Sequence, residues 1–332
     1  MRPSEEHSLT DVAQAVGVDI GGTKIAAARV NGTGVVHEVA YRATPPLQAE
    51  ARAVEDAIVD AVSALSEPDD LPVGVGAAGF VDADGRIVRF APHVNWRDEP
   101  LADRLQGRLG RPVVVENDAN AAAWAEFRFG AGRSERRLML ITLGTGIGGA
   151  MVHDGRLERG AHGMAGEFGH MSVVPGGRAC ECGNRGCWEQ YASGSALRRE
   201  AFERLSGRHR LPRAWVESGM DRPSAITGEG VSVLAHTGDP LAADVVAAVG
   251  TWLGRGIADL VAAVDPGKVV IGGGGAGAGD LLLDPARAAL AAHLSGRGFR
   301  TCPEIVPADL GPRAGLVGAA DLARRSSAGQ EG

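Results

Sequence analysis

The first third of the chain alternates short apolar runs with segments in which apolar residues recur at helical spacing. Three runs typical of strands come first, at residues 16–20, 25–30 and 35–40. Val54, Ile58, Ala61, Val62 and Leu65 then follow the spacing of one helix face, which predicts a helix over residues 49–66. Two further strands are predicted at residues 72–78 and 112–116, with a helix between them at Leu101, Leu105 and Leu109. The order βββαβαβ indicates an α/β domain.

A similar order returns in the second part of the chain, after a helix predicted at residues 118–129. The elements expected there are strands at 138–143, 150–153, 268–271 and 304–306 and helices at 240–264, 281–290 and 314–324. Each half opens with a strand, a glycine turn and a second strand, which indicates a weak internal duplication. We therefore predict two α/β domains that face each other across a cleft.

The predicted boundaries follow from these elements. A small α/β domain is expected over residues 16–118 and 310–325, and a large α/β domain over residues 119–309. Residues 1–15 and 326–332 are expected to be flexible ends. Residues 205–229 contain proline, glycine and serine and are expected to form a surface excursion.

Composition and charge restrict the class of protein. Hydrophobic residues make up 44% and charged residues 23% of the 332 residues, which is the ordinary balance of a globular protein. Aromatic residues are only 4%, so the core must consist mainly of alanine, valine, leucine and isoleucine. The formal net charge of −7 argues against a general nucleic-acid or anionic-membrane binder, because such proteins need a basic surface.

Neither the N-terminus nor any internal segment predicts a membrane association. Residues 1–14 are polar and acidic and do not resemble a secretory signal. The most apolar long segment, residues 245–264, is interrupted by Arg255 and Asp259. We expect a cytoplasmic protein.

The first glycine turn, Asp19-Ile20-Gly21-Gly22-Thr23-Lys24, has the composition of a phosphate-binding hairpin. A glycine pair lets backbone N–H groups face an anion, and Asp19 at the strand end can hold a divalent cation. The segment is not a P-loop, because Thr-Lys replaces Lys-Ser/Thr and a strand follows. A plain hairpin turn is the alternative for a glycine pair alone.

The second glycine turn, residues 143–149, contains a formal G-x-G-x-x-G at Gly144, Gly146 and Gly149. A dinucleotide site requires a helix after this motif, but residues 150–153 predict a strand, which excludes a nicotinamide-dependent oxidoreductase. A second phosphate-binding hairpin fits better. The third run, residues 272–275, lies between a strand and a helix and either receives a nucleotide base or ribose or is a plain loop.

One histidine and three cysteines lie close together in the sequence. His170, Cys180, Cys182 and Cys187 supply the four ligands of a closed, tetrahedral structural zinc site, and glycines between the cysteines allow sharp turns. Cysteines that gather in a cytoplasmic chain indicate a metal before a disulfide. Cys302 is expected to be an ordinary buried thiol.

Several polar residues are candidates for substrate contact. Asp118 lies where a strand gives way to a helix, and its two candidate roles are helix cap and general base for a sugar hydroxyl. Glu167 and Glu189 flank the cysteine cluster and either accept hydrogen bonds from sugar hydroxyls or form a solvated rim. Asn95, beside Trp96, is a further candidate.

Five motifs together resemble the ROK family, most closely its zinc-containing, ATP-dependent sugar kinases that act on glucose. They are DIGGTK from Asp19, VENDANAAAW from Val115, LGTGIGG from Leu143, EFGH from Glu167 and CxCGxxGCxE from Cys180. The resemblance covers residues 16–324. It implies an actin-like ATPase (hexokinase-type) fold of two α/β domains with sugar and ATP in the cleft, and phosphorylation of the 6-hydroxyl of glucose.

The resemblance also implies residue roles. It makes Asp118 the catalytic base, and it places Mg²⁺ near Asp19 and structural Zn²⁺ on the cysteine cluster. His170 would bind zinc with one ring nitrogen and the sugar with the other. The implied sugar contacts are Gly79, Asn95, Asn117, Asp118, Glu167, His170 and Glu189. The implied ATP contacts are Asp19, Gly21, Gly22, Thr23, Lys24, Gly144, Thr145, Gly146, Gly272, Gly273 and Gly274. A homodimer or homotetramer is implied as well.

Two alternatives stay open at this point. The ROK family includes transcriptional repressors with an N-terminal helix-turn-helix, but only about fifteen residues precede the first predicted strand and the charge is acidic. The other alternative is a kinase for fructose, mannose or an N-acetylhexosamine, because the pocket residues serve several hexoses.

Overall fold

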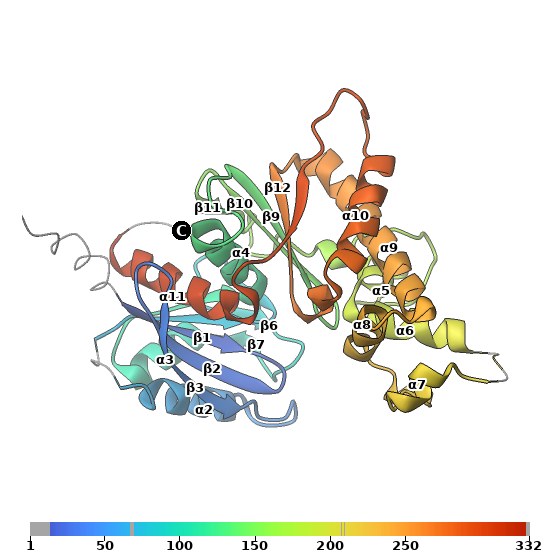
Figure 1. Cartoon of the computed structure of the whole chain (residues 1–332). Helices are drawn as coiled ribbons and strands as arrows, with labels where there is room; N and C mark the ends of the chain where they lie inside the picture. The colour runs from blue at the N-terminus through green and yellow to red at the C-terminus, as the bar shows by residue number, and fades with distance from the viewer. Residues whose placement is uncertain (1–13, 67–69, 207, 209, 330–332) are drawn as a thin grey trace, which may run out of the picture. The chain divides into compact units, whose positions relative to one another are not determined.

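The computed structural model describes residues 14–66, 70–206, 208 and 210–329, which form two compact units (Figure 1). Unit 1 comprises the described parts of residues 1–136, 150–166 and 309–332. Unit 2 comprises the described parts of residues 137–149 and 167–308. The flexible ends expected at residues 1–15 and 326–332 fall mainly outside the described residues, and the predicted domain boundaries stay predictions.

Unit 1 is built on a five-stranded sheet with the order β3-β2-β1-β4-β8. Its strands are β1 (Ala15–Ile20), β2 (Lys24–Val30), β3 (Val36–Ala43), β4 (Val73–Ala77) and β8 (Val113–Asn117). The first three strands form an antiparallel meander, and β1, β4 and β8 run parallel with Ile20, Ala77 and Asn117 in register. The carboxyl ends of the three parallel strands therefore meet at one edge, where α/β proteins bind ligands.

Helices cover both faces of this sheet (Figure 1). They are α2 (Ala51–Ser63), α3 (Leu101–Leu109), α4 (Asp118–Phe129) and α11 (Ala314–Ser327), with the 3₁₀ turn η4 (Gly311–Arg313) before α11. Val16 and Val18 of β1 point to the core under α2 and α3. Gly17, on the opposite face, adjoins α11, and a β-carbon there would overlap the carbonyl oxygen of Leu316. The glycine thus lets the helix backbone touch the strand.

A small three-stranded sheet, with the order β5-β6-β7, follows β4. Its strands are β5 (Phe80–Val81), β6 (Val88–Phe90) and β7 (Arg97–Glu99). Trp96 and Val88 are buried in the same core as α2 and α3. This sheet therefore holds the loop of residues 91–96, which carries Asn95, against unit 1.

The second five-stranded sheet has the order β11-β10-β9-β12-β13. Its strands are β9 (Arg137–Leu143), β10 (Ile147–His153), β11 (Arg156–Leu157), β12 (Lys268–Gly272) and β13 (Glu304–Pro307). β9 and β12 run parallel, as do β12 and β13. Because β10 follows the second glycine turn directly, the expected strand in place of a helix is confirmed.

The helices of unit 2 surround one long central helix. They are η1 (Phe168–His170), α5 (Glu189–Ala192), α6 (Gly194–Leu205), α7 (Arg213–Glu217), η2 (Pro223–Ala225), α8 (Gly228–His236), α9 (Pro240–Val264), η3 (Gly274–Ala278) and α10 (Asp280–His293). Among the described residues, α9 has the length and composition to cross a membrane, yet 61% of its most apolar window is buried. A β-carbon at Gly250 or Gly254 would overlap a carbonyl oxygen of α10. α9 is therefore packed as a core helix.

The strands and helices predicted from hydrophobic spacing are confirmed, with shifts of a few residues at their ends. The β5-β6-β7 sheet and α5–α8 were not predicted. The segment expected as a surface excursion contains α7, whose Trp215 is completely buried and donates its indole N–H to Asp239 at 3.1 Å. Because Asp239 also caps α9 by accepting from the Ala242 N–H, the excursion is anchored to the central helix.

Candidate active site and metal centre

The first glycine turn connects β1 to β2 at the carboxyl edge of the unit 1 sheet. It is closed by the Gly21 N–H, which donates to the Lys24 carbonyl at 3.0 Å, and Gly22, Thr23 and Lys24 are exposed. Thr44, just after β3, pins both sides of the turn. Its hydroxyl donates to the Gly21 carbonyl at 2.7 Å and its N–H to the Thr23 carbonyl at 3.1 Å. A glycine turn held in this way keeps its exposed backbone groups available to an anion.

Two side chains give this turn its charge. The Lys24 ammonium lies 5.2 Å from the centre of the Tyr41 ring, a cation–π distance. Asp19 lies beside the first turn of α11, where a β-carbon at Gly315 would be 3.3 Å from its carboxylate. Burial and the neighbouring Asp118 raise the pKa of Asp19 to about 6, although Lys24 opposes this shift. Two interacting carboxylates favour a nearby cation.

The junction of β8 and α4 presents Asn117 and Asp118. The cap of α4 is Asn117, whose side-chain oxygen accepts from the N–H groups of Ala119 and Asn120 at 2.9 and 3.1 Å. The capping role considered for Asp118 thus belongs to its neighbour. Asp118 accepts from the Ala119 N–H at 2.9 Å. Burial raises the pKa of Asp118, and the Ala119 N–H and the charge of His93 oppose the shift in part.

Gly79 and Asn95 lie on the connections that follow β4. The Gly79 carbonyl accepts from the Asn117 amide at 3.0 Å, and its φ of +140° places it in a region that other residues avoid. Asn95 is exposed between the buried Val94 and Trp96, so its backbone is held from both sides.

His93 was not singled out in the sequence. A β-carbon at Gly22 would lie 4.0 Å from its ring, and its charge lowers the pKa of Asp118. This histidine therefore lies near both the first glycine turn and Asp118. Its position next to Asn95 in the chain was the one available signal.

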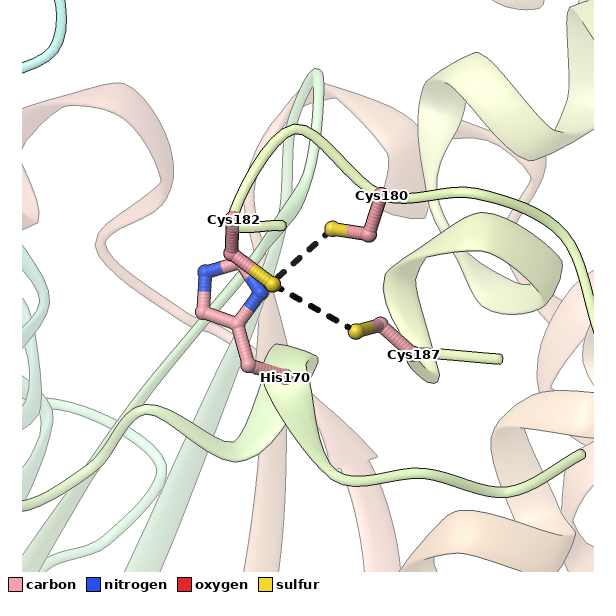
Figure 2. Close-up of side chains that lie close together, drawn as sticks. All are labelled: His170, Cys180, Cys182 and Cys187. Carbon is pink, nitrogen blue, oxygen red and sulfur yellow. Dashed lines mark hydrogen bonds between the residues drawn. The ribbon is translucent and has the colours of Figure 1, made fainter. Parts of the chain in front are cut away.

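The histidine and cysteine side chains predicted to bind a metal come together in unit 2 (Figure 2). His170 Nδ1 and the sulfurs of Cys180, Cys182 and Cys187 all lie within 4.8 Å of one another. The His170 Nδ1–Cys180 Sγ distance is 3.7 Å and the Cys182 Sγ–Cys187 Sγ distance is 3.6 Å. In a tetrahedral zinc site, Zn–S bonds of about 2.3 Å separate neighbouring sulfurs by about 3.8 Å. The four donors fit such an ion.

The chemistry of the thiols agrees with this geometry. Burial, followed by a hydrogen bond to the Glu189 carboxylate at 3.0 Å, raises the pKa of the Cys180 thiol to about 12. Burial likewise raises the pKa of the Cys187 thiol, whereas the pKa of Cys182 is lowered, because hydrogen bonds, first from the Asn184 backbone, outweigh its burial. A divalent cation deprotonates the thiols that bind it.

Two carboxylates face opposite nitrogens of the His170 ring. Glu189 Oε1 lies 3.8 Å from Nδ1, on the side of the cysteines, and Glu167 Oε2 lies 3.7 Å from Nε2. A ring that turns Nδ1 to the cysteines therefore leaves Nε2 on the side of Glu167.

Within unit 2 the second glycine turn lies next to Glu189, which is bonded to the cysteine cluster, and the third glycine run lies against Leu143 at the end of β9. The Gly144 carbonyl accepts from the Gly194 N–H at 2.9 Å, and a β-carbon at Gly146 would overlap the Glu189 carboxylate. Gly273, with φ of +83°, lies against Leu143, where a β-carbon would overlap the carbonyl oxygen. These close approaches explain sterically why Gly146 and Gly273 are glycines.

The structure thus gathers the predicted residues into two sets. Unit 1 holds Asp19, Gly21, Gly22, Thr23, Lys24, Gly79, Asn95, Asn117 and Asp118. Unit 2 holds Gly144, Thr145, Gly146, Glu167, His170, Cys180, Cys182, Cys187, Glu189, Gly272, Gly273 and Gly274. In unit 1 the set follows the carboxyl edge of one sheet, and in unit 2 it surrounds the cysteine cluster and the turns after β9 and β12.

Comparison with known proteins agrees with these features. The ROK family model matches residues 15–326. A glucokinase of Streptomyces coelicolor is 45% identical over 313 residues, which cover 93% of this chain and 97% of that protein. A ROK family glucokinase from Streptomyces griseus, solved in complex with glucose and AMPPNP, is 47% identical with a TM-score of 0.84, over 94% of this chain and 99% of that one. A ROK transcriptional regulator, a homologue of the E. coli MLC protein, is 27% identical with a TM-score of 0.81, over 95% of this chain and 79% of that one.

Two α/β units with paired sheets and strand-edge glycine turns define an actin-like ATPase fold, as predicted. The chain belongs to the ROK family.

Proposed function

We propose that this protein is an ATP-dependent hexose kinase that phosphorylates the 6-hydroxyl of glucose. The observation that carries the proposal is the match, over nearly the whole of both chains, to a glucokinase solved with glucose and AMPPNP. The half-buried carboxylate of Asp118, directly after β8, supplies the group that such a reaction needs.

Asp118 is the general base in this proposal. A base must accept the proton of the attacking hydroxyl, and its efficiency rises as its pKa approaches the working pH. The raised pKa of Asp118 moves it in that direction. Asn117 takes over the capping of α4, so the Asp118 carboxylate accepts one backbone N–H and keeps acceptor capacity for a hydroxyl proton.

The exposed glycine turns serve the phosphates of ATP. The first turn offers Gly21, Gly22, Thr23 and the Lys24 charge, and the second offers Gly144, Thr145 and Gly146, while Gly272, Gly273 and Gly274 serve the adenosine. Mg²⁺, when bound, neutralises phosphate charge, and Asp19 with its raised pKa of about 6 is the residue suited to hold it, directly or through water.

The sugar contacts are Gly79, Asn95, Asn117, Asp118, Glu167, His170 and Glu189. His170 supports this role because its Nε2 lies on the side of Glu167 while Nδ1 faces the cysteines. A bound Zn²⁺ would fix the rotamer and tautomer of the imidazole. With four protein ligands its position is closed, so zinc would orient residues and take no part in phosphoryl transfer.

The acidic charge supports a cytoplasmic enzyme that does not act on nucleic acid or membranes. Assembly as a homodimer or homotetramer is part of the same proposal and is tested by light scattering of the purified protein.

The test is ADP release with ATP and Mg²⁺, with glucose, fructose, mannose, N-acetylglucosamine and N-acetylmannosamine presented separately. We expect the highest kcat/KM with glucose. A higher kcat/KM with another hexose would make that hexose the preferred substrate. No activity with any hexose would contradict the proposed kinase activity.

A further inference from the structure

One buried carboxylate next to the proposed base makes none of the proposed contacts to sugar or ATP. Glu116, the penultimate residue of β8, is 5% exposed. One of its oxygens, Oε1, accepts from the Asn117 N–H at 3.0 Å and from the Asn120 side-chain amide at 2.9 Å. The carboxylate therefore binds the backbone N–H directly before Asp118 and a side chain in the first turn of α4, directly after it.

The charge of Glu116 is matched by an arginine from a distant part of the sequence. Arg159 Nε donates to the other oxygen, Oε2, at 2.7 Å, and the Arg159 side chain is 27% exposed. A buried carboxylate is costly unless it is paired, so Glu116 needs this partner to stay ionised in place. A charge-assisted bond of this length is among the stronger hydrogen bonds in proteins.

Arg159 belongs to a segment that is itself fixed to unit 1. The Arg159 carbonyl accepts from the Ala165 N–H at 3.1 Å, which closes the segment into a loop. Gly163, with φ of +77°, lies against β5, where a β-carbon would overlap the carbonyl oxygen of Val81. The loop leads along the chain directly to Glu167, a proposed sugar contact.

We propose that Glu116 and Arg159 are positioning residues for phosphoryl transfer, and that their ion pair fixes the direction of the Asp118 carboxylate and anchors the segment that precedes Glu167. The inference rests on the proposed kinase function. Neither residue contacts the reacting atoms in this proposal. Both act through the β8–α4 junction, where a displacement of about 1 Å can lower the rate about 100-fold.

A second ion pair in unit 1 provides a matched control. Glu55 of α2 has a side chain that is 4% exposed and pairs with Arg104 of α3 at 3.1 Å. The pair resembles Glu116–Arg159 in burial and charge, but it joins two helices that carry none of the proposed site residues. Removing the charge of either carboxylate should lower Tm. Only removal of the Glu116 charge should lower kcat.

The experiment measures kcat, KM for the hexose, KM for ATP and Tm for wild type, Glu116→Gln, Arg159→Met, Arg159→Lys and Glu55→Gln. The hexose is the one that wild type phosphorylates fastest. We expect kcat to fall about 10- to 100-fold in Glu116→Gln and Arg159→Met, with KM for ATP within about twofold of wild type. Arg159→Lys, which keeps the charge, should recover part of kcat. Glu55→Gln should lower Tm and keep kcat within about twofold.

Two results would overturn the proposal. The first is kcat near the wild-type value in folded Glu116→Gln or Arg159→Met. The second is an equal loss of kcat in Glu55→Gln, which would reduce the effect to general destabilisation. Arg159→Lys serves where the other variants fail to fold, since an unchanged kcat and an unchanged KM for the hexose would contradict a geometric role.

A crystal structure of Arg159→Met tests the geometry apart from any activity. We expect the Asp118 carboxylate or residues 159–166 to be displaced from their wild-type positions. An unchanged junction would contradict the inference even if wild type phosphorylates no hexose, so its failure is distinguishable from failure of the proposed function.

Discussion

The β8–α4 junction of unit 1 and the cysteine cluster of unit 2 both present groups suited to a sugar, but they are held in different ways. At the junction, Asn117 caps the helix and Glu116 is paired with Arg159, so the capping amide and the buried carboxylate are both held by groups of the chain itself. In the cluster, the donor atoms of one histidine and three cysteines lie within 4.8 Å of one another, close enough to bind one metal ion. The junction is held by hydrogen bonds and an ion pair within unit 1, whereas we propose that a bound cation holds the cluster.

The two regions should therefore respond differently to substitution and to loss of a metal. Changes at the junction should alter chemistry with little effect on metal content. Loss of the metal should disorder His170 and Glu189 and alter sugar affinity, while the base keeps its position.

The largest effect is expected for Asp118→Asn. Loss of a general base lowers kcat by about 10² to 10⁴-fold. Burial raises the pKa of Asp118 above its unfolded value, so ionised Asp118 destabilises the folded protein when the pH exceeds the folded pKa. The neutral amide removes this penalty, and Tm at neutral pH should equal or exceed that of wild type. Steady-state kinetics and thermal unfolding check both parts. Turnover near wild type would exclude Asp118 as the base.

The next largest effect is expected for Cys182→Ser, which removes one of four metal donors. Bound zinc, measured by atomic absorption, should fall, and KM for glucose should rise about tenfold or more through His170. The control is Cys302→Ser, because Cys302 lies outside the cluster and, contrary to the expectation of a buried thiol, is exposed. If zinc content falls while KM for glucose stays constant, the double role of His170 is wrong.

A smaller effect is expected from pH. The base must be ionised, so kcat/KM should fall as the pH drops through the raised pKa of Asp118, with a midpoint above the ordinary aspartate value of 3.8. A pH–rate profile between neutral and acid conditions measures this midpoint. Constant kcat/KM down to the ordinary aspartate range would contradict a buried base.

The smallest effect is expected at Thr44, which pins the first glycine turn. Thr44→Val removes the hydroxyl that donates to the Gly21 carbonyl at 2.7 Å. Loss of one such bond, about 1 kcal/mol, should raise KM for ATP about fivefold and leave KM for glucose unchanged. Thr44→Ser retains the hydroxyl and should behave as wild type. Equal changes in KM for ATP and KM for glucose would show that the hydrogen bond stabilises the whole fold and has no specific effect on the glycine turn.

The sequence predicted the glycine turns and the gathering of one histidine with three cysteines because their signals are local. Glycine pairs after apolar runs mark the turns, and Cys180, Cys182 and Cys187 are close neighbours in the chain. Hydrophobic spacing likewise indicated the strands of both five-stranded sheets. The three-stranded sheet was missed because strands as short as β5 carry no readable alternation.

The residues that hold the site could not be predicted, because their partners are distant in sequence. Thr44 meets Gly21 across the β1–β2–β3 meander, and Arg159, which follows β11, meets Glu116 of β8 from 43 residues further along the chain. At the junction, local signals favoured two roles for Asp118. Asn117 is the cap of α4 because its side-chain oxygen accepts from the N–H groups of both Ala119 and Asn120.

The most direct test of the account is the product formed from glucose and ATP by wild type and Asp118→Asn, analysed side by side by NMR. We predict glucose phosphorylated at the 6-hydroxyl from wild type, and a rate of formation reduced at least about 100-fold in the folded variant. Phosphate on another position, no product from wild type, or equal rates from both proteins would contradict it.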